Sequence, residues 1–200
     1  MKSRLLLAFL LSIVAGLQTI KAQTSYDLWI AGIQVTSSNM NELSELVAEL
    51  DEEAMERYFN GEMEITFDGN QTLTLKNAII KPEAGVCGIQ SKLQNLDIKL
   101  IGENTITSAG TSAVVLQRHF QAGATTFIGD GSLEITSNSN SGAFRTQRDI
   151  VIKDGAKITV DGTGDLGFHG RSVMSGGDGP TLTMQGGGTE LRAKGGSSGS

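Results

Sequence analysis

The chain has a single cysteine, two prolines, few aromatic residues and no net positive charge. Three of these shortages restrict the kinds of structure and partner that the chain can have. A single cysteine, Cys87, rules out a disulfide within the 200 residues, and its neighbours Val86 and Ile89 favour a buried thiol. With about 5% aromatic residues an exposed aromatic platform is not expected, so Trp29 is assigned to the core or the cap. The formal charge is −6, and such acidity argues against nucleic acid as a partner, because phosphate binding needs clustered cations.

Long apolar runs are also missing, except at the N-terminus. There Lys2 and Arg4 precede an apolar stretch over residues 5–17, and Ile20-Lys21-Ala22 offers a cleavage site. The stretch is too short for a membrane span. We therefore expect residues 1–22 to be a signal peptide, the mature protein to be secreted or held at the cell surface, and no transmembrane segment.

The remaining chain is dominated by one repeated phrase, in which two short alternating runs flank a Gly-containing turn. It occupies residues 97–107, 126–135, 150–160 and 182–191, and a fainter copy lies at 72–80. Alignment of the phrases gives steps of 25, 27, 25 and 32 residues, which is a solenoid period. We expect one internal column from Leu75, Leu100, Phe127, Ile152 and Met184. A second column is expected from Ile106, Leu133, Ile158 and Leu191.

A third apolar position recurs between the phrases, at Ile89, Leu116, Phe144 and Phe168. Three strands per coil is the arrangement of a parallel β-helix, in which like positions stack about 4.8 Å apart. A sandwich has no reason to repeat its inward residues with this period. The predicted fold is therefore all-β, a right-handed parallel β-helix over residues 72–200. Since the chain ends soon after the last phrase, we expect it to be truncated there, with further coils or another domain beyond it.

Residues 23–71 differ from the repeat and predict a cap of strand, helix and strand. Alternating residues at 26–36 indicate the first strand, and residues 63–67 the second. An amphipathic pattern predicts a helix over about 41–59, which Asn60-Gly61 ends. A solenoid needs such a unit, because its first coil otherwise exposes open sheet edges.

These segments resemble a family. The stretch Tyr26-Asp27-Leu28-Trp29-Ile30-Ala31-Gly32-Ile33-Gln34-Val35-Thr36, the phrase at 72–78 and the phrase at 99–107 are similar to secreted bacterial repeat proteins classed as carbohydrate-binding-domain proteins. The resemblance implies a right-handed β-helix similar in fold to pectate-lyase-like enzymes. It also implies binding of polysaccharides, acidic ones included, sometimes with calcium. The shared motifs are chiefly structural, so they specify the fold better than the ligand.

Cations follow the third apolar position of each coil, and they are the first candidate binding residues: Lys92, Arg118, His119, Arg145, Arg148, His169 and Arg171. Stacking of the coils is expected to turn them into a column of positive charge. Like charges one rung apart repel, so an anion such as a row of uronate carboxylates would neutralise the column. The alternative is a solvated row of loop residues with acidic neighbours.

Acidic residues in two Gly-rich turns are weaker candidates, for calcium: Asp161, Asp165 and Asp178. Turn formation alone also explains them. No other cofactor is indicated, and no residue stands out as catalytic. The leading hypothesis is a non-catalytic glycan-binding β-helix. The alternatives are a polysaccharide lyase acting on uronate polymers and a structural or adhesive repeat spacer.

Overall fold

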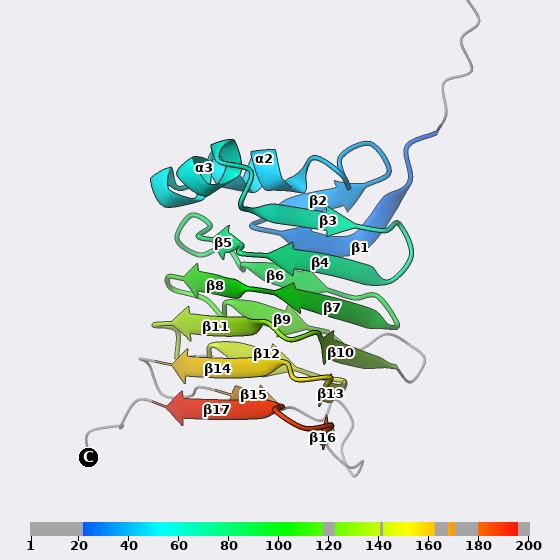
Figure 1. Cartoon of the computed structure of the whole chain (residues 1–200), viewed down its shortest axis with the longest axis vertical. Coiled ribbons are helices and arrows are strands. Elements are labelled where there is room, and N and C mark those ends of the chain that lie inside the picture. The colour runs from blue at the N-terminus through cyan, green and yellow to red at the C-terminus, as the bar shows by residue number, and fades with distance from the viewer. Residues whose placement is uncertain (1–21, 118–122, 141, 163–167, 171–179, 196–200) are drawn as a thin grey trace, which may run out of the picture.

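A computed structural model describes residues 22–117, 123–140, 142–162, 168–170 and 180–195. These residues form a right-handed parallel β-solenoid of about three turns, covered at its N-terminal end by two helices (Figure 1). The predicted fold class is thereby confirmed. Of the expected signal peptide only Ala22 falls among the described residues. None of the helices in the described ranges is long and apolar enough to cross a membrane.

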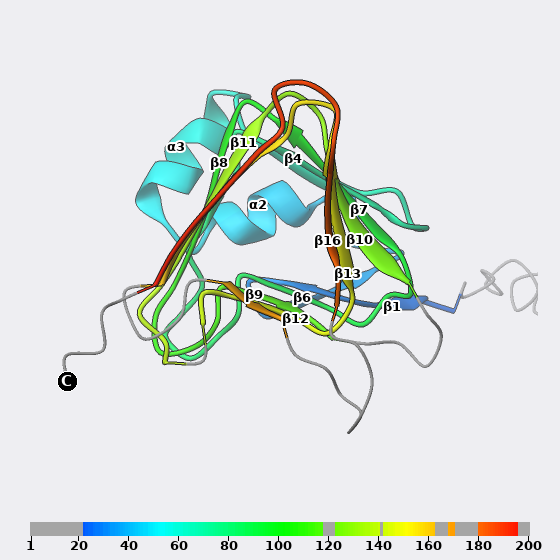
Figure 2. The same ribbon diagram turned by 90° about the horizontal axis from the view of Figure 1, so that it is seen from below.

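Three sheets form the walls of a triangular tube (Figure 2). Sheet A contains, from the capped end, β2 (Ile33–Thr36), β1 (Ser25–Ile30), β6 (Ile89–Ser91), β9 (Val114–Leu116), β12 (Phe144–Thr146) and β15 (Phe168–Gly170). Sheet B contains β3 (Glu64–Phe67), β4 (Thr72–Lys76), β7 (Leu96–Ile101), β10 (Ala124–Ile128), β13 (Asp149–Lys153) and β16 (Leu182–Gln185). Sheet C contains β5 (Ile79–Ile80), β8 (Glu103–Ser108), β11 (Ser132–Ser137), β14 (Lys157–Gly162) and β17 (Glu190–Gly195).

Alternation of apolar and polar residues decides which face of each strand lines the tube. In β7, Leu96, Ile98 and Leu100 are fully buried, whereas Asp97 and Lys99 between them face outward. The same period-two pattern holds in β10, β11, β13 and β14. The core is therefore one continuous apolar filling inside the tube.

The coil-to-coil register differs by two residues from the predicted columns. Phe127 lies opposite Ile98 and Ile152, whereas Leu100 lies opposite Leu75. The prediction aligned the turn glycine Gly102 with Gly129, but the ladder stacks Gly102 on Gly131, because Glu103 pairs with Ser132. A shift of two residues keeps every predicted side chain on the inward face and changes only its neighbours above and below.

The column predicted from Ile106 and the column predicted from Ile89 each contain one step at which the observed register differs by two residues. Leu133 lies opposite Asn104 and Ile158, so Ile106 belongs to the neighbouring column with Ile135. In sheet A, Val114 rather than Leu116 lies between Ile89 and Phe144, and Leu116 lies between Ser91 and Thr146. Sequence similarity favoured the alignment that placed Leu100 with Phe127 and Ile89 with Leu116. The ladder pairing shows a different register at both steps.

Asn104 shows why an amide occupies a buried position in the column of Leu133. Its Oδ1 accepts a hydrogen bond from Ala78 N at 2.9 Å. Its Nδ2 donates to Ile101 O at 3.3 Å and to Ser132 O at 3.0 Å. The buried amide is therefore satisfied by three main-chain partners in three successive coils, and it ties those coils together at the corner between sheets B and C.

Two helices, α2 (Leu43–Ala48) and α3 (Glu52–Phe59), occupy the range predicted as one helix over 41–59. The break lies at Asp51, whose backbone is extended and whose carboxylate accepts hydrogen bonds from the N–H groups of Glu53 and Ala54, both at 3.1 Å. An aspartate in this position starts a new helix and so ends the preceding one. The amphipathic pattern continues across the break, which is why the sequence indicated a single helix.

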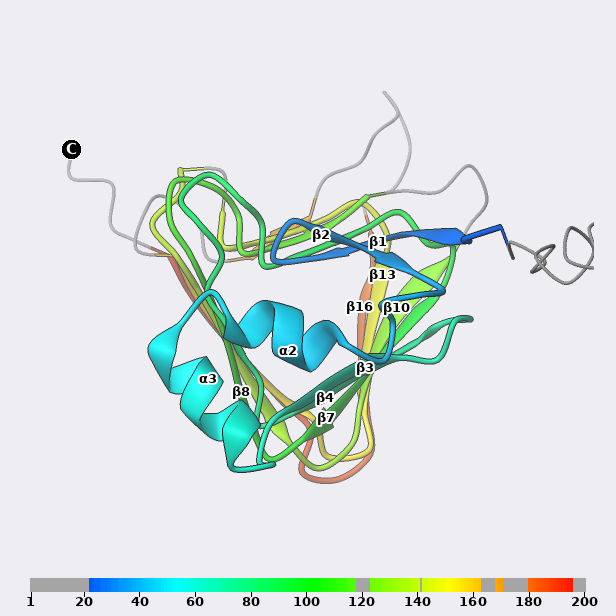
Figure 3. The same cartoon turned by 90° about the horizontal axis from the view of Figure 1, so that it is seen from above.

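The shorter helix α2 lies across the open end of the tube (Figure 3) and buries Leu43, Val47 and Ala48. Ser44 fixes its position, because its Oγ accepts from Ile65 N at 2.7 Å and donates to Ile65 O at 3.3 Å. At the same end the strands β1, β2 and β3 run antiparallel to their neighbours. The predicted function of this unit as a cap over the first coil agrees with these contacts. Cys87, expected to be buried, is only half-buried.

Phe127 tests the core. It is 1% exposed and its ring lies 6.1 Å from that of Phe144, so Phe127→Ala is expected to lower the free energy of unfolding by about 3–5 kcal/mol. Chemical denaturation measures this loss. The matched control is Phe59→Ala on α3, where the side chain is 78% exposed and the loss is expected to be small. Equal losses in the two variants would contradict the assignment of the core.

Asp51 tests the cap. Burial raises the pKa of its carboxyl, but hydrogen bonds from Ala54 and Glu53 and the Lys81 ammonium at 3.2 Å outweigh burial and hold the pKa below its usual value. Its contribution is therefore present above the unfolded pKa and is lost as the pH falls through the lower folded pKa. Asp51→Ala is expected to cost about 1 kcal/mol at pH 7.

The difference between parent and Asp51→Ala should shrink as the pH is lowered from 7 into the range where aspartate protonates. Thermal unfolding of both proteins across that range measures it. A difference that stays constant with pH would show that the Asp51 charge does not contribute. Glu56→Ala, later in the same helix, controls for loss of an acidic side chain without loss of the cap.

Candidate functional site

The outward-facing side chains at the middle of each strand in sheet A form one row along the tube, here called the outer row. Ladder pairing fixes its order, which from the capped end is Gln34, Trp29, Gln90, Val115, Arg145 and His169. Successive members stand one strand apart, about 4.8 Å. The described side chains of the row are therefore amides, an indole, an aliphatic group and a guanidinium, and its strands form one wall of the tube, whose backbone Figure 2 shows.

Trp29 is the aromatic member of the row, and it lies on the first strand of the segment predicted to be the cap. It lies on β1 between Leu28 and Ile30, which are fully buried, so its own side chain points outward and is half-buried. The exposed Lys92 follows β6, and its ammonium lies 5.5 Å from the centroid of the Trp29 ring. Such a contact adds a cation–π attraction and places a positive charge beside the indole.

Arg145 and His169 are the two predicted binding residues that the structure brings together. They are ladder partners in β12 and β15. Arg145 is half-buried. Of His169 only the backbone is described, and it fixes the position of the residue in the row.

Arg148, also predicted to bind a ligand, lies inside the corner between sheets A and B. It is 5% exposed. Its Nε donates to Gln117 O at 3.0 Å, and its Nη2 donates to the same oxygen and to Ser91 O at 3.1 Å. Its Nη1 donates to Leu93 O. The guanidinium is thus taken up by carbonyl oxygens of the two preceding coils, so the assignment of Arg148 to an exposed binding column is wrong.

The environment of Arg148 is unusual for a charged group. No carboxylate of the described residues forms an ion pair with it, and burial lowers the pKa of its guanidinium to about 10. A planar fork of five donors suits several carbonyls at once, which a lysine does not. Arg148 therefore acts as a staple that joins three coils at one corner, where it donates to the carbonyls of Leu93 and Gln117 and shares Ser91 O with the Gln117 N–H.

The predicted basic column is not a single row in the structure. Lys92 lies two residues after Gln90, which is the row member of β6, so it stands beside the outer row and not in it. It lies opposite Asp27, whose carbonyl accepts the Lys92 N–H at 2.8 Å. Arg145 is in the row, and Arg148 is buried. Arg118, His119 and Arg171 lie outside the described residues. Among the described members of the predicted column, only Arg145 and the backbone of His169 therefore lie in the outer row.

Asp161, a predicted calcium ligand, belongs to β14 rather than to a turn. Ladder pairing places it opposite Thr136 and Lys194, and the Lys194 ammonium lies 3.8 Å from its carboxylate. Asp165 and Asp178 fall outside the described residues, and among those described no group of three acidic, His or Cys side chains forms a metal site. The Asp161 carboxylate therefore pairs with an exposed lysine, as a solvated surface residue does.

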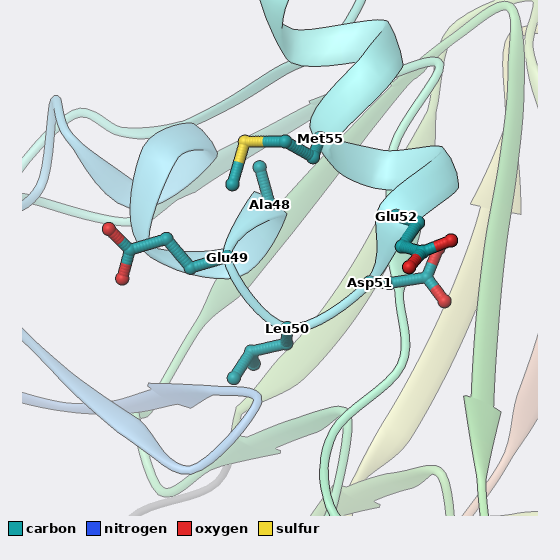
Figure 4. A pocket seen from close by; sticks show the side chains of 6 residues that line it. All are labelled: Ala48, Glu49, Leu50, Asp51, Glu52 and Met55. Carbon is teal, nitrogen blue, oxygen red and sulfur yellow. The ribbon is translucent and has the colours of Figure 1, made fainter.

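A shallow hollow of about 320 Å³ lies between α2 and α3 (Figure 4). Ala48, Leu50 and Met55 give it an apolar floor, and Glu49, Asp51 and Glu52 surround it. The Asp51 carboxylate is already engaged by the N-terminus of α3 and by Lys81. No polar group of the hollow is left buried and unpaired, so it has no feature that selects a ligand.

Arg148 generates a prediction about stability. Arg148→Met keeps much of the side-chain volume but removes the Arg148 donors from the carbonyls of Leu93 and Gln117 and one of two donors from Ser91 O, and it is expected to cost about 3 kcal/mol. The control, Arg145→Met, replaces an outward arginine of the same wall and is expected to change the free energy of unfolding little. Urea denaturation compares the two. A stable Arg148→Met protein would contradict the staple.

No protein-family model, no curated protein and no solved structure matches the chain. The solenoid fold therefore rests on the structure itself, and the resemblance to carbohydrate-binding-domain proteins stays a prediction.

Proposed function

We propose that the protein is a non-catalytic glycan-binding β-solenoid, secreted or held at the cell surface, that binds an acidic polysaccharide along the outer row of sheet A. The observation that carries the proposal is the row itself, in which an indole and a guanidinium point outward from one rigid wall. Strands hold side chains in fixed positions better than loops do, which suits recognition of an extended polymer.

The chemistry of the row fits a chain of sugar rings that carry carboxylates. An indole face packs against the apolar C–H face of a pyranose ring, and amides such as Gln90 offer both a donor and acceptors to hydroxyl groups. Arg145 offers a fork of donors to a carboxylate, and Lys92 offers a point charge. Trp29 and Arg145 stand three rungs apart, or about 14 Å, so a ligand that reaches both must span several sugar rings.

Removal of the two cations tests the proposal. The double variant Lys92→Gln with Arg145→Gln is expected to weaken binding to polygalacturonate by about 1–2 kcal/mol, and the parent affinity should fall as salt rises. Affinity electrophoresis at low and high salt measures both effects. Trp29→Ala should weaken binding at either salt concentration, since stacking does not depend on screening.

The matched control, Lys99→Gln with Arg192→Gln, removes equal charge from the outer faces of sheets B and C. It should bind like the parent, because the proposed contact lies on sheet A alone. Equal weakening in both double variants would reduce the effect to net charge and refute a site on the outer row. A rise in ultraviolet absorbance during incubation with polygalacturonate would instead reveal unsaturated products and favour the lyase alternative.

A further inference from the structure

The two helices of the cap carry as much net charge as the whole chain. Residues 42–59, which contain α2 and α3, have seven carboxylates and one arginine, so their net charge of −6 equals that of all 200 residues. The other residues together are therefore neutral. Among the described residues outside this segment only Lys81 forms an ion pair with it, to Asp51 and Glu53. A surface with so much charge of one sign attracts partners of the other sign.

Apolar side chains lie among these carboxylates at the surface of the cap. Leu50 is 40% exposed, and Phe59, at 78%, is the most exposed large apolar side chain of the described residues. Met55, one turn before Phe59 on α3, lines the hollow between the helices together with Leu50. Leu50, Met55 and Phe59, here called the cap strip, therefore place apolar surface on the outside of an acidic unit.

Three exposed carboxylates border the cap strip, those of Glu49, Glu52 and Glu56. Glu49 and Glu52 point to opposite sides of the hollow (Figure 4). Glu56 lies on α3 three residues before Phe59, so the two are neighbours on the helix surface. None of the three forms an ion pair within the described ranges. The cap strip is thus bordered by charge of one sign that the rest of the described chain leaves unbalanced.

We propose that the cap strip and its three carboxylates bind a basic amphipathic helix of another protein. An apolar side chain of that helix lies over the hollow between α2 and α3, and lysine or arginine residues on either side of it pair with Glu49, Glu52 and Glu56. The hollow has no buried group that selects a small molecule, whereas a helix is recognised by such a pattern of apolar and charged positions.

The charge of the cap decides between the possible occupants. A second copy of this chain does not supply the partner helix, because α2 and α3 are the only helices described and both are acidic. An acidic polysaccharide is repelled by the same carboxylates. The cap surface is therefore separate from the outer row, and this proposal does not depend on glycan binding.

The probe that tests the proposal is a fluorescently labelled synthetic peptide of leucine and lysine, with its leucines on one face of a helix. Fluorescence anisotropy measures its binding to the protein. The parent is expected to bind, and its dissociation constant should rise with salt. Phe59→Ala should raise the dissociation constant about tenfold, since it removes a central apolar contact. Glu49→Gln with Glu52→Gln should raise it about fivefold or more.

Matched control variants change the same kinds of side chain outside the cap. Ile128→Ala shortens an outward apolar side chain of sheet B, and Glu83→Gln with Glu134→Gln removes equal charge from other exposed positions. Both should bind the peptide like the parent. Circular dichroism of every variant checks that the fold is retained, which is expected because these side chains lie at the surface.

A second peptide, with serine in place of every leucine, separates helix recognition from attraction between net charges. It keeps every lysine and is expected to bind at least about tenfold more weakly, because it has no apolar face for the cap strip. Failure of the parent to bind the first peptide, equal binding of the two peptides, or equal losses in the cap and control variants would each overturn the proposal.

Discussion

Stacking of each coil on the one before it, in a fixed register, is the interaction on which the rest of the structure depends. The hydrogen bonds of the parallel ladders join residues 24 or more positions apart, such as Phe144 and Phe168, so each pairing closes a long loop and costs entropy. The apolar filling of the tube offsets that cost, and it does so only when inward side chains of successive coils meet. Register and core are therefore one constraint, because neither forms without the other.

The corners show how the chain satisfies main-chain groups where the ladders stop. Asn104 serves the corner between sheets B and C, and Arg148 serves the corner between sheets A and B. Both side chains are buried and polar, and both bond to carbonyl oxygens of neighbouring coils. Because each reaches more than one coil, the corners link rungs that the sheets join only pairwise.

The repeat length and the alternation of apolar residues were sufficient to predict the solenoid, its three strands per coil and its cap. They were insufficient for the register, because either Gly129 or Gly131 could be aligned with Gly102. Only the ladder pairing shows that Gly131 is the residue stacked on Gly102. The position of Trp29 was available from the sequence, because its neighbours Leu28 and Ile30 are the inward pair. The burial of Arg148 was not, because no local pattern marks a charged residue that bonds to carbonyls two coils away.

The outer row differs in character along its length, and this restricts the ligand that suits it. Its upper part, nearest the cap, carries Trp29 and the amides of Gln34 and Gln90, whereas Arg145 lies further down. A polyanion without apolar faces would leave the indole unused, and a neutral glycan would leave the guanidinium unpaired. A polymer that has both a C–H face and a carboxylate in its repeating unit uses both parts of the row. For that reason we propose an acidic polysaccharide as the ligand of this wall rather than either simpler ligand.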